Sequence, residues 1–134
     1  MGYLTQVNWI AVLIGGVFNM VLGSLWYGPL FGNAWLRAIG KRQDEIQSSL
    51  GMYILPFLAG VASAYVLALI IAGLGITIWW QGLIMGAIVW IGIGAAATFT
   101  TGTFEDQPRA AWMLFAFYQL IVYAAQGIVF VVWT

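Results

Sequence analysis

Cysteine and histidine are both missing from this 134-residue sequence, and charged side chains make up only 6% of it. The lack of cysteine excludes disulfides and thiolate chemistry. Without either residue, metal sites built on thiolate or imidazole ligands are excluded, so we expect no metal and no other cofactor. A formal net charge of zero provides no basic surface, and we expect no nucleic-acid partner.

Catalytic groups are equally scarce, because the only acids are four carboxylates in two adjacent pairs. General acid–base and nucleophilic catalysis need side chains that exchange protons or attack a substrate. We therefore expect no enzyme, with a hydrolytic site centred on Glu105 as the one catalytic alternative left open. Proton-coupled transport of the kind seen in small multidrug exporters is also disfavoured, because no ionisable acid or base lies within the expected spans.

What the sequence has instead is long uncharged runs, since 63% of its residues are hydrophobic. All charges lie in two short stretches, from Arg37 to Glu45 and from Glu105 to Arg109. A bilayer-spanning helix needs about 20 apolar residues, and the runs hold four of them. The sequence predicts an all-α integral membrane bundle, a single domain over residues 1–134. Its transmembrane helices should cover about 7–27, 53–73, 81–101 and 111–133.

Charge placement predicts the orientation of these four helices. The basic residues Arg37, Lys41, Arg42 and Arg109 all lie in the connections that follow the first and third spans. Short loops rich in lysine and arginine stay in the cytoplasm. We therefore expect a multi-pass protein of the cell membrane, in a bacterium the inner membrane, with these two connections in the cytoplasm and both termini outside.

Amide side chains recur on one face of the first and last spans. At about 100° per residue, Asn8 and Asn19 share a face of the first helix, as do Gln119, Tyr123 and Gln126 on the last. Because Asn19 and Gln119 lie at similar depths, we predict that they hydrogen-bond. These side chains either hold the helices together through interhelical hydrogen bonds or line a path for a small neutral solute.

The two middle spans are rich in small residues, which allow helices to approach closely. Gly82, Gly86 and Gly94 follow one another at intervals of four or eight residues on the third span. The number of such surfaces favours a homodimer, in which leucine at Gly86 or Gly94 should break the assembly. Four helices can also satisfy these surfaces internally.

The connection between the first two spans is the least ordinary segment. It turns at Gly28-Pro29, and Asn33 is a candidate cap for a restarted helix at about 33–43. Trp35 and Leu36 oppose basic residues there, as in an amphipathic helix lying in the interface. Anchoring explains the tryptophans of this segment without a ligand.

A cluster is expected on the cytoplasmic side, where the ends of three spans meet. Its members are Trp26, Tyr27, Arg37, Glu105 and Arg109. Glu105 either pairs with Arg37 or Arg109 as a structural clasp or lies at the mouth of a cavity, and the clasp is the favoured interpretation.

Several of these residues also form a pattern that resembles a known family. At the start of the chain the pattern comprises Asn8-Trp9, Ala11-Val12, Gly23, Trp26-Tyr27-Gly28-Pro29, Leu30-Phe31-Gly32 and Trp35. It resembles the beginning of the bacterial membrane family catalogued as a domain of unknown function, DUF1761. Phe104-Glu105 and the stretch from Tyr118 through Gly127 to Trp133 resemble its end. The sequence departs from the family pattern at Gln107, where a basic residue is expected and Arg109 follows instead. The resemblance implies a small four-helix membrane protein and no particular activity.

Two functional hypotheses follow from the sequence. The first is a passive or facilitative protein that binds or transports a small neutral solute along the amide-lined face. The second is a non-catalytic accessory or structural protein that binds a membrane partner or a lipid.

Overall fold

The computed structural model describes residues 6–42, 44, 50–106 and 108–133, and within these ranges every regular element is helical. Its α-helices are α1 (Trp9–Leu25), α2 (Gly32–Ile39), α3 (Gly51–Leu74), α4 (Trp79–Val89), α5 (Ala96–Phe104) and α6 (Arg109–Val132). Two π-helical segments, Trp26–Leu30 and Trp90–Ala95, continue α1 and join α4 to α5. The predicted fold class is confirmed.

Four helical stretches are long and apolar enough to cross a membrane. They are Trp9–Leu30, Gly51–Leu74, Trp79–Phe104 and Arg109–Val132. Their mean hydropathy ranges from 1.8 to 2.4. Their outer faces expose large apolar side chains throughout, which only a lipid environment covers without cost. The chain is therefore a multi-pass membrane protein.

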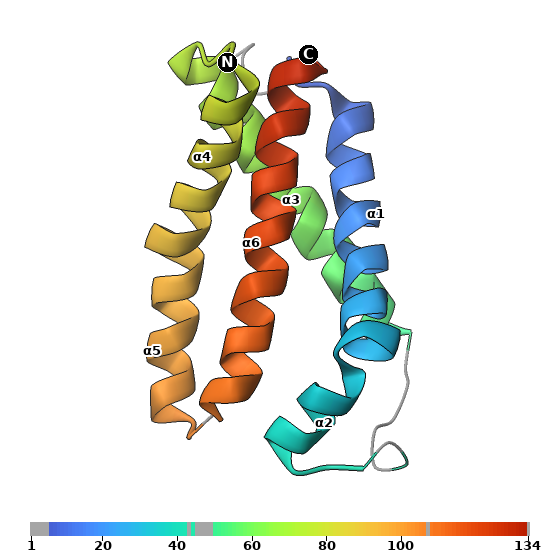
Figure 1. The fold of residues 1–134 in the computed structure, drawn as a ribbon. Helices are drawn as coiled ribbons and strands as arrows, with labels where there is room; N and C mark the ends of the chain where they lie inside the picture. Colours follow the sequence, from blue (N-terminus) through green and yellow to red (C-terminus); the bar gives the residue numbers. More distant parts are fainter. Residues whose placement is uncertain (1–5, 43, 45–49, 107, 134) are drawn as a thin grey trace.

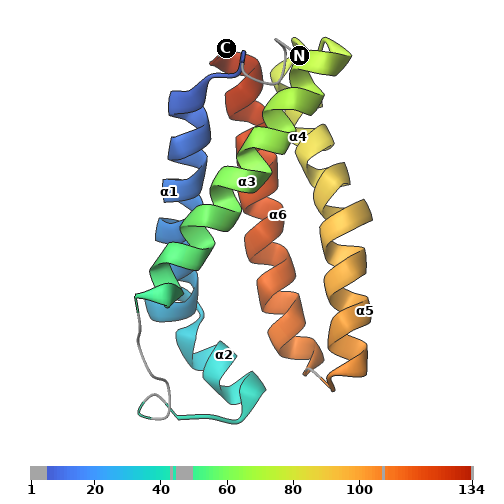
Figure 2. The ribbon, with the colours of Figure 1, turned by 180° about the vertical axis from the view of Figure 1, so that it is seen from behind.

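The spans alternate in direction, so both described ends of the chain lie together with the α3–α4 turn at one end of the bundle (Figure 1). The α2 segment and the α5–α6 turn lie at the other end. Helix α3 runs obliquely, from beside α1 to the beginning of α4 (Figure 2). Helix α6 is the central element, because it contacts α1, α3 and α4.

Glycines set the closest helix contacts, α1 against α3 and α4 against α6. A Cβ on Gly60 of α3 would lie 2.8 Å from the Gly16 Cα of α1. On α4, a Cβ on Gly82 or Gly86 would collide with the backbone of α6. Gly86 therefore packs within one chain, and the expectation that it holds two subunits together is wrong. The homodimer itself stays a prediction.

At Gly94, the other glycine of the expected assembly surface, a Cβ would collide with the Trp90 ring of the same span. The π-helical segment that contains both residues brings this ring over the glycine. In contrast, nothing lies within 4 Å of a Cβ on Gly92, so this glycine faces outward.

The first span ends in a kink, as the Gly28-Pro29 pair predicts. Gly28 has the non-helical angles φ −111° and ψ −107°, and Pro29 offers no N–H to continue the helix. Helix α2 then begins at Gly32 and lacks a side-chain cap, so the expected cap at Asn33 is wrong. It ends at Ile39, earlier than expected, because Gly40 adopts the left-handed conformation with φ 70°.

Helix α2 also folds back on the bundle. It contacts α6 and buries Leu36, whose side chain is 8% exposed. Its position therefore closes one end of the space between α1, α3 and α6.

Candidate functional site

Asn19 of α1 is buried and joins three spans through its side chain. Its Nδ2 donates to the Pro56 carbonyl oxygen of α3 at 2.7 Å. Its Oδ1 accepts from Gln119 Nε2 of α6 at 3.2 Å, which confirms the predicted hydrogen bond between these amides. The Tyr118 hydroxyl lies within hydrogen-bond distance of the same Oδ1 and of the Asn19 carbonyl oxygen.

Gln126 lies about two turns beyond Gln119 on α6 and makes a second connection between the same three helices. Its Nε2 donates to the carbonyl oxygens of Gly15 and Gly60, at 3.4 and 3.3 Å. Its Oε1 accepts from the Ser63 hydroxyl at 3.1 Å. These carbonyls are reachable because the glycines leave the backbone uncovered.

A pocket of about 430 Å³ lies beside the Asn19 network, at the end of the bundle where the first span kinks. We call it the aromatic pocket. Its lining residues come from α1, the π-helical turn, α2, α3 and α6: Met20, Gly23, Ser24, Tyr27, Gly28, Trp35, Met52, Tyr53, Pro56 and Tyr118. Three further cavities among the described residues are smaller, at about 300, 210 and 160 Å³.

The Asn19 network and the aromatic pocket share two residues, Tyr118 and Pro56. The Tyr118 ring lines the pocket while its hydroxyl is hydrogen-bonded to Asn19. This hydrogen bond fixes the position of the ring. Tyr27 packs edge-on against Tyr118 and Trp35, with ring centroids 5.9 and 5.1 Å apart. The pocket wall is therefore held by side chains that are themselves tied to the bundle.

Two residues of the predicted amide face lie elsewhere. Asn8 caps α1, its Oδ1 accepting from the Ala11 N–H at 3.1 Å, and its Nδ2 donates to the Trp133 carbonyl oxygen at 3.2 Å. Tyr123 turns its ring towards Trp90, with centroids 5.5 Å apart. Asn8 thus closes a helix end, whereas Tyr123 contacts the third span and also interacts with Ser63, the hydroxyl partner of Gln126.

The groove between α1 and α6 is apolar rather than amide-lined. Its volume is about 160 Å³, and Gln126 is the one polar side chain among its lining residues. Since the Gln126 amide is already bonded to backbone and to Ser63, it offers no free group to a solute.

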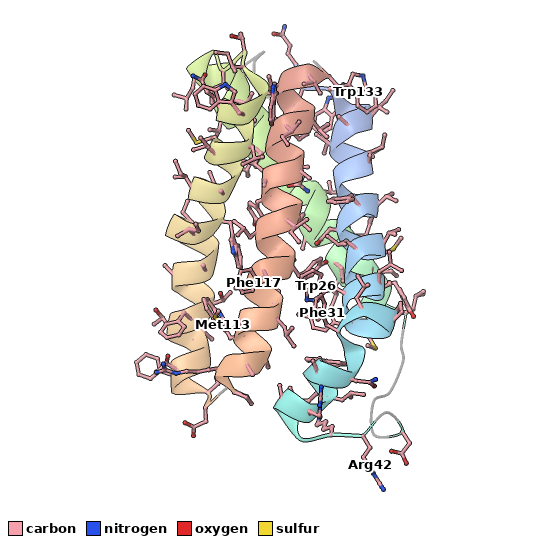
Figure 3. All side chains as sticks on the ribbon, in the orientation of Figure 1. Trp26, Phe31, Arg42, Met113, Phe117 and Trp133 are labelled. Atoms are coloured by element: carbon pink, nitrogen blue, oxygen red, sulfur yellow. The ribbon has the colours of Figure 1, made fainter. Side chains whose placement is uncertain are left out.

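The predicted cytoplasmic-side cluster divides into two parts. Trp26 and Phe31 lie between the first span and α6 (Figure 3), with ring centroids 4.4 Å apart. Trp26 is 8% exposed, and its indole Nε1 has no hydrogen-bond partner among the described residues. Tyr27 joins the aromatic pocket, whereas Arg37 is exposed on α2 and lines none of the four cavities.

Glu105 and Arg109 lie at the α5–α6 turn, away from these aromatic residues. Among the described residues, Glu105 forms no ion pair within 4.0 Å, so the favoured clasp with Arg37 or Arg109 is wrong. Glu105 instead lines the cavity of about 300 Å³ between α5 and α6. The Arg109 guanidinium lies over the Phe99 ring, 5.8 Å from its centroid.

Tyr118, Pro56 and Tyr53 are site residues that sequence reasoning missed. Tyr118 comes one residue before Gln119, which places it about 100° away from the amide stripe of α6. One signal was available: Gly23 on α1, whose Cβ would lie 2.7 Å from the Tyr118 hydroxyl. A glycine opposite a buried tyrosine marks the space that the ring occupies.

The aromatic pocket is lined by uncharged side chains. None of its lining residues is ionised at neutral pH, and no group of three or more metal-ligating side chains occurs in the described part of the chain. What the pocket offers is ring faces, hydroxyls and thioethers beside the membrane-facing surface of α1 and α3.

The family comparison agrees with the sequence pattern. The model of the family described as "Protein of unknown function (DUF1761)" matches residues 10–131, and the chain belongs to this family. Neither the curated proteins nor the solved structures include a match.

Proposed function

We propose that this member of DUF1761 is a non-catalytic membrane protein that binds an amphipathic small molecule, a lipid or a lipid-like compound, in the aromatic pocket. One observation carries the proposal: a cavity of about 430 Å³ at the kinked end of the first span, lined by both hydroxyl-bearing and apolar side chains. Ligand pockets commonly combine an apolar lining with a few fixed polar groups.

The position of the pocket suits a ligand that resides in the membrane. Ser24, Met52 and Tyr53 are exposed on the outer surface of the bundle and also line the pocket. A molecule held by its polar end among the tyrosines can therefore extend its apolar part along α1 and α3 into lipid.

The hydrogen-bond pattern gives less support to a path for a neutral solute. Asn19, Gln119 and Gln126, the amides expected to line it, bond to one another or to backbone and hydroxyl groups of the bundle. Leaving such groups unpaired in an apolar medium would cost several kcal/mol, on the order of 2–7 for each. Their pairing supports a structural role.

The charge distribution supports a cytoplasmic position for the pocket in a cell membrane. The basic residues Arg37, Lys41 and Arg42 follow Trp35, the pocket residue of α2, and α6 begins with Arg109 at the same end of the bundle (Figure 1). By the positive-inside rule this end faces the cytoplasm.

The test compares what the protein retains when released gently from its membrane. Native mass spectrometry should show one bound amphiphile on the unchanged protein. Ser24→Trp fills the mouth of the pocket and should abolish binding of the amphiphile. Val21→Trp adds the same ring to the outer face of the same helix and should leave the amphiphile bound. Equal retention by both variants, or no retained amphiphile on the unchanged protein, would overturn the proposal.

Since Ser24→Trp could disturb folding, the pocket is also filled from α3 by Met52→Trp. Met52 is 45% exposed, so its neighbours are not tightly packed around it. Circular dichroism establishes that each variant has kept its helices, and only such variants are compared.

A further inference from the structure

The lining of the aromatic pocket indicates the head group of its ligand. Four of its residues are aromatic, and each comes from a different element: Tyr27 from the π-helical turn, Trp35 from α2, Tyr53 from α3 and Tyr118 from α6. We propose that these rings form a cage for a quaternary ammonium head group of the trimethylammonium type. The inference rests on the proposed function, because it names the ligand of the same pocket.

Ring geometry is the first argument. The plane of Tyr27 makes an angle of 67° with Trp35 and of 86° with Tyr118. These edge-to-face contacts place the three rings in different planes along one side of the pocket. The negatively polarised face of an aromatic ring attracts a cation placed within about 6 Å of its centroid, and several rings together recognise quaternary ammonium groups.

The charge of the lining is the second argument. None of the described residues that line the pocket carries a charge. An anionic head would find no lysine or arginine, and a metal ion or primary ammonium would find no carboxylate to replace its strongly bound water. A quaternary ammonium holds water weakly and donates no hydrogen bonds, so it loses least on entering this lining.

The remaining polar groups do not alter this preference. The carbonyl end of the first span and the N–H end of α3 both reach the pocket, and their partial charges are of opposite sign. They therefore offset each other. Met20 and Met52 add polarisable sulfur atoms, which pack against methyl groups readily.

The test uses two amphiphiles that differ in one atom. Full-length protein, stripped of lipid in a neutral maltoside detergent, is titrated with lysophosphatidylcholine. A second titration uses its isostere, in which a carbon atom replaces the quaternary nitrogen and leaves a tert-butyl head of the same shape. Binding is measured by native mass spectrometry, and the cage predicts about a tenfold preference for the ammonium compound.

Tyr53 supplies the matched variants. It is 46% exposed on α3, so its replacement should leave the fold intact. Tyr53→Phe keeps the ring face and should keep the preference, whereas Tyr53→Leu should reduce it severalfold. If both variants lost the preference for the ammonium compound, the hydroxyl and not the ring face would select the ligand. This result would overturn the inference.

The outcomes separate this inference from the proposed function. If both amphiphiles bind equally and Ser24→Trp displaces both, the pocket binds amphiphiles without selecting a cation, and only the present inference fails. If Ser24→Trp affects neither, the pocket is not the binding site and both proposals fail.

Discussion

Replacing Gly60 by alanine should destabilise the bundle, because this glycine lies where α1, α3 and α6 meet. The added Cβ would lie 2.7 Å from the Asn19 Cβ, 2.8 Å from the Gly16 Cα and 2.9 Å from the Gly15 carbonyl oxygen. Carbon atoms pack best at about 3.5–4.0 Å. Helices α1 and α3 must therefore separate by about 1 Å, since two of the three obstacles are backbone atoms.

The separation should also break hydrogen bonds that are already long. Gln126 Nε2 lies 3.3 Å from the Gly60 carbonyl oxygen and 3.4 Å from that of Gly15, so a shift of this size leaves room for only one of them. Overpacking costs about 1–3 kcal/mol. Each lost intramembrane hydrogen bond adds about 0.6 kcal/mol. Because alanine also gains about 1 kcal/mol of helix propensity over glycine, we expect the free energy of unfolding to fall by about 1–3 kcal/mol.

Gly73, on the same helix, provides the control. Nothing lies within 4 Å of a Cβ there, so Gly73→Ala adds the same methyl group and the same gain in helix propensity without a collision. Both variants are unfolded reversibly by sodium dodecyl sulfate in mixed micelles, with helix content followed by circular dichroism. Equal unfolding midpoints for the two variants would refute the packing argument.

Three further predictions concern other parts of the chain. Gly86→Ala should lower the free energy of unfolding by about 1–3 kcal/mol, because its Cβ would collide with the Tyr123 backbone. Gly92→Ala, whose Cβ meets nothing within 4 Å, should not lower it. The same denaturant titration compares the two variants, and an equal effect would argue against the α4–α6 contact. Asn8→Ala should cost about 1 kcal/mol through loss of the α1 cap, and an unchanged unfolding midpoint would contradict the cap. In the cysteine-free protein, an impermeant thiol reagent added to intact cells should label Ile76→Cys but not Gln43→Cys, and the reverse pattern would overturn the orientation.

Much of the fold could be predicted from composition and spacing. Uncharged runs of spanning length identified all four membrane helices. Helix α3 ends at Gly75, which adopts a φ of 67°, a conformation that glycine tolerates at the turn into α4. These features are local: they depend on how many apolar residues follow one another and on which residue tolerates a left-handed backbone.

Within the site, the Asn19–Gln119 contact was predictable because helix periodicity and depth together leave few partners for a buried amide. The aromatic pocket was not. It exists because the first span kinks at Gly28 by an amount that the sequence does not specify, and because α2 then folds back on α6. Glu105 shows the same limit: pairing depends on the separation of helix ends, which chain order leaves undetermined.

The central position of α6 has a consequence for how the protein is made. Helices α1, α3 and α4 leave the ribosome before α6, yet α6 supplies the side chains that bond to Asn19 of α1 and Ser63 of α3. Until α6 enters the bilayer, the Asn19 Oδ1 lacks the Tyr118 and Gln119 donors, and the glycine face of α4 lacks its partner. Helices α1 and α3 can pack together before α6 arrives, through their glycine contact and the Asn19–Pro56 hydrogen bond, whereas α4 should be held loosely until the fourth span is released.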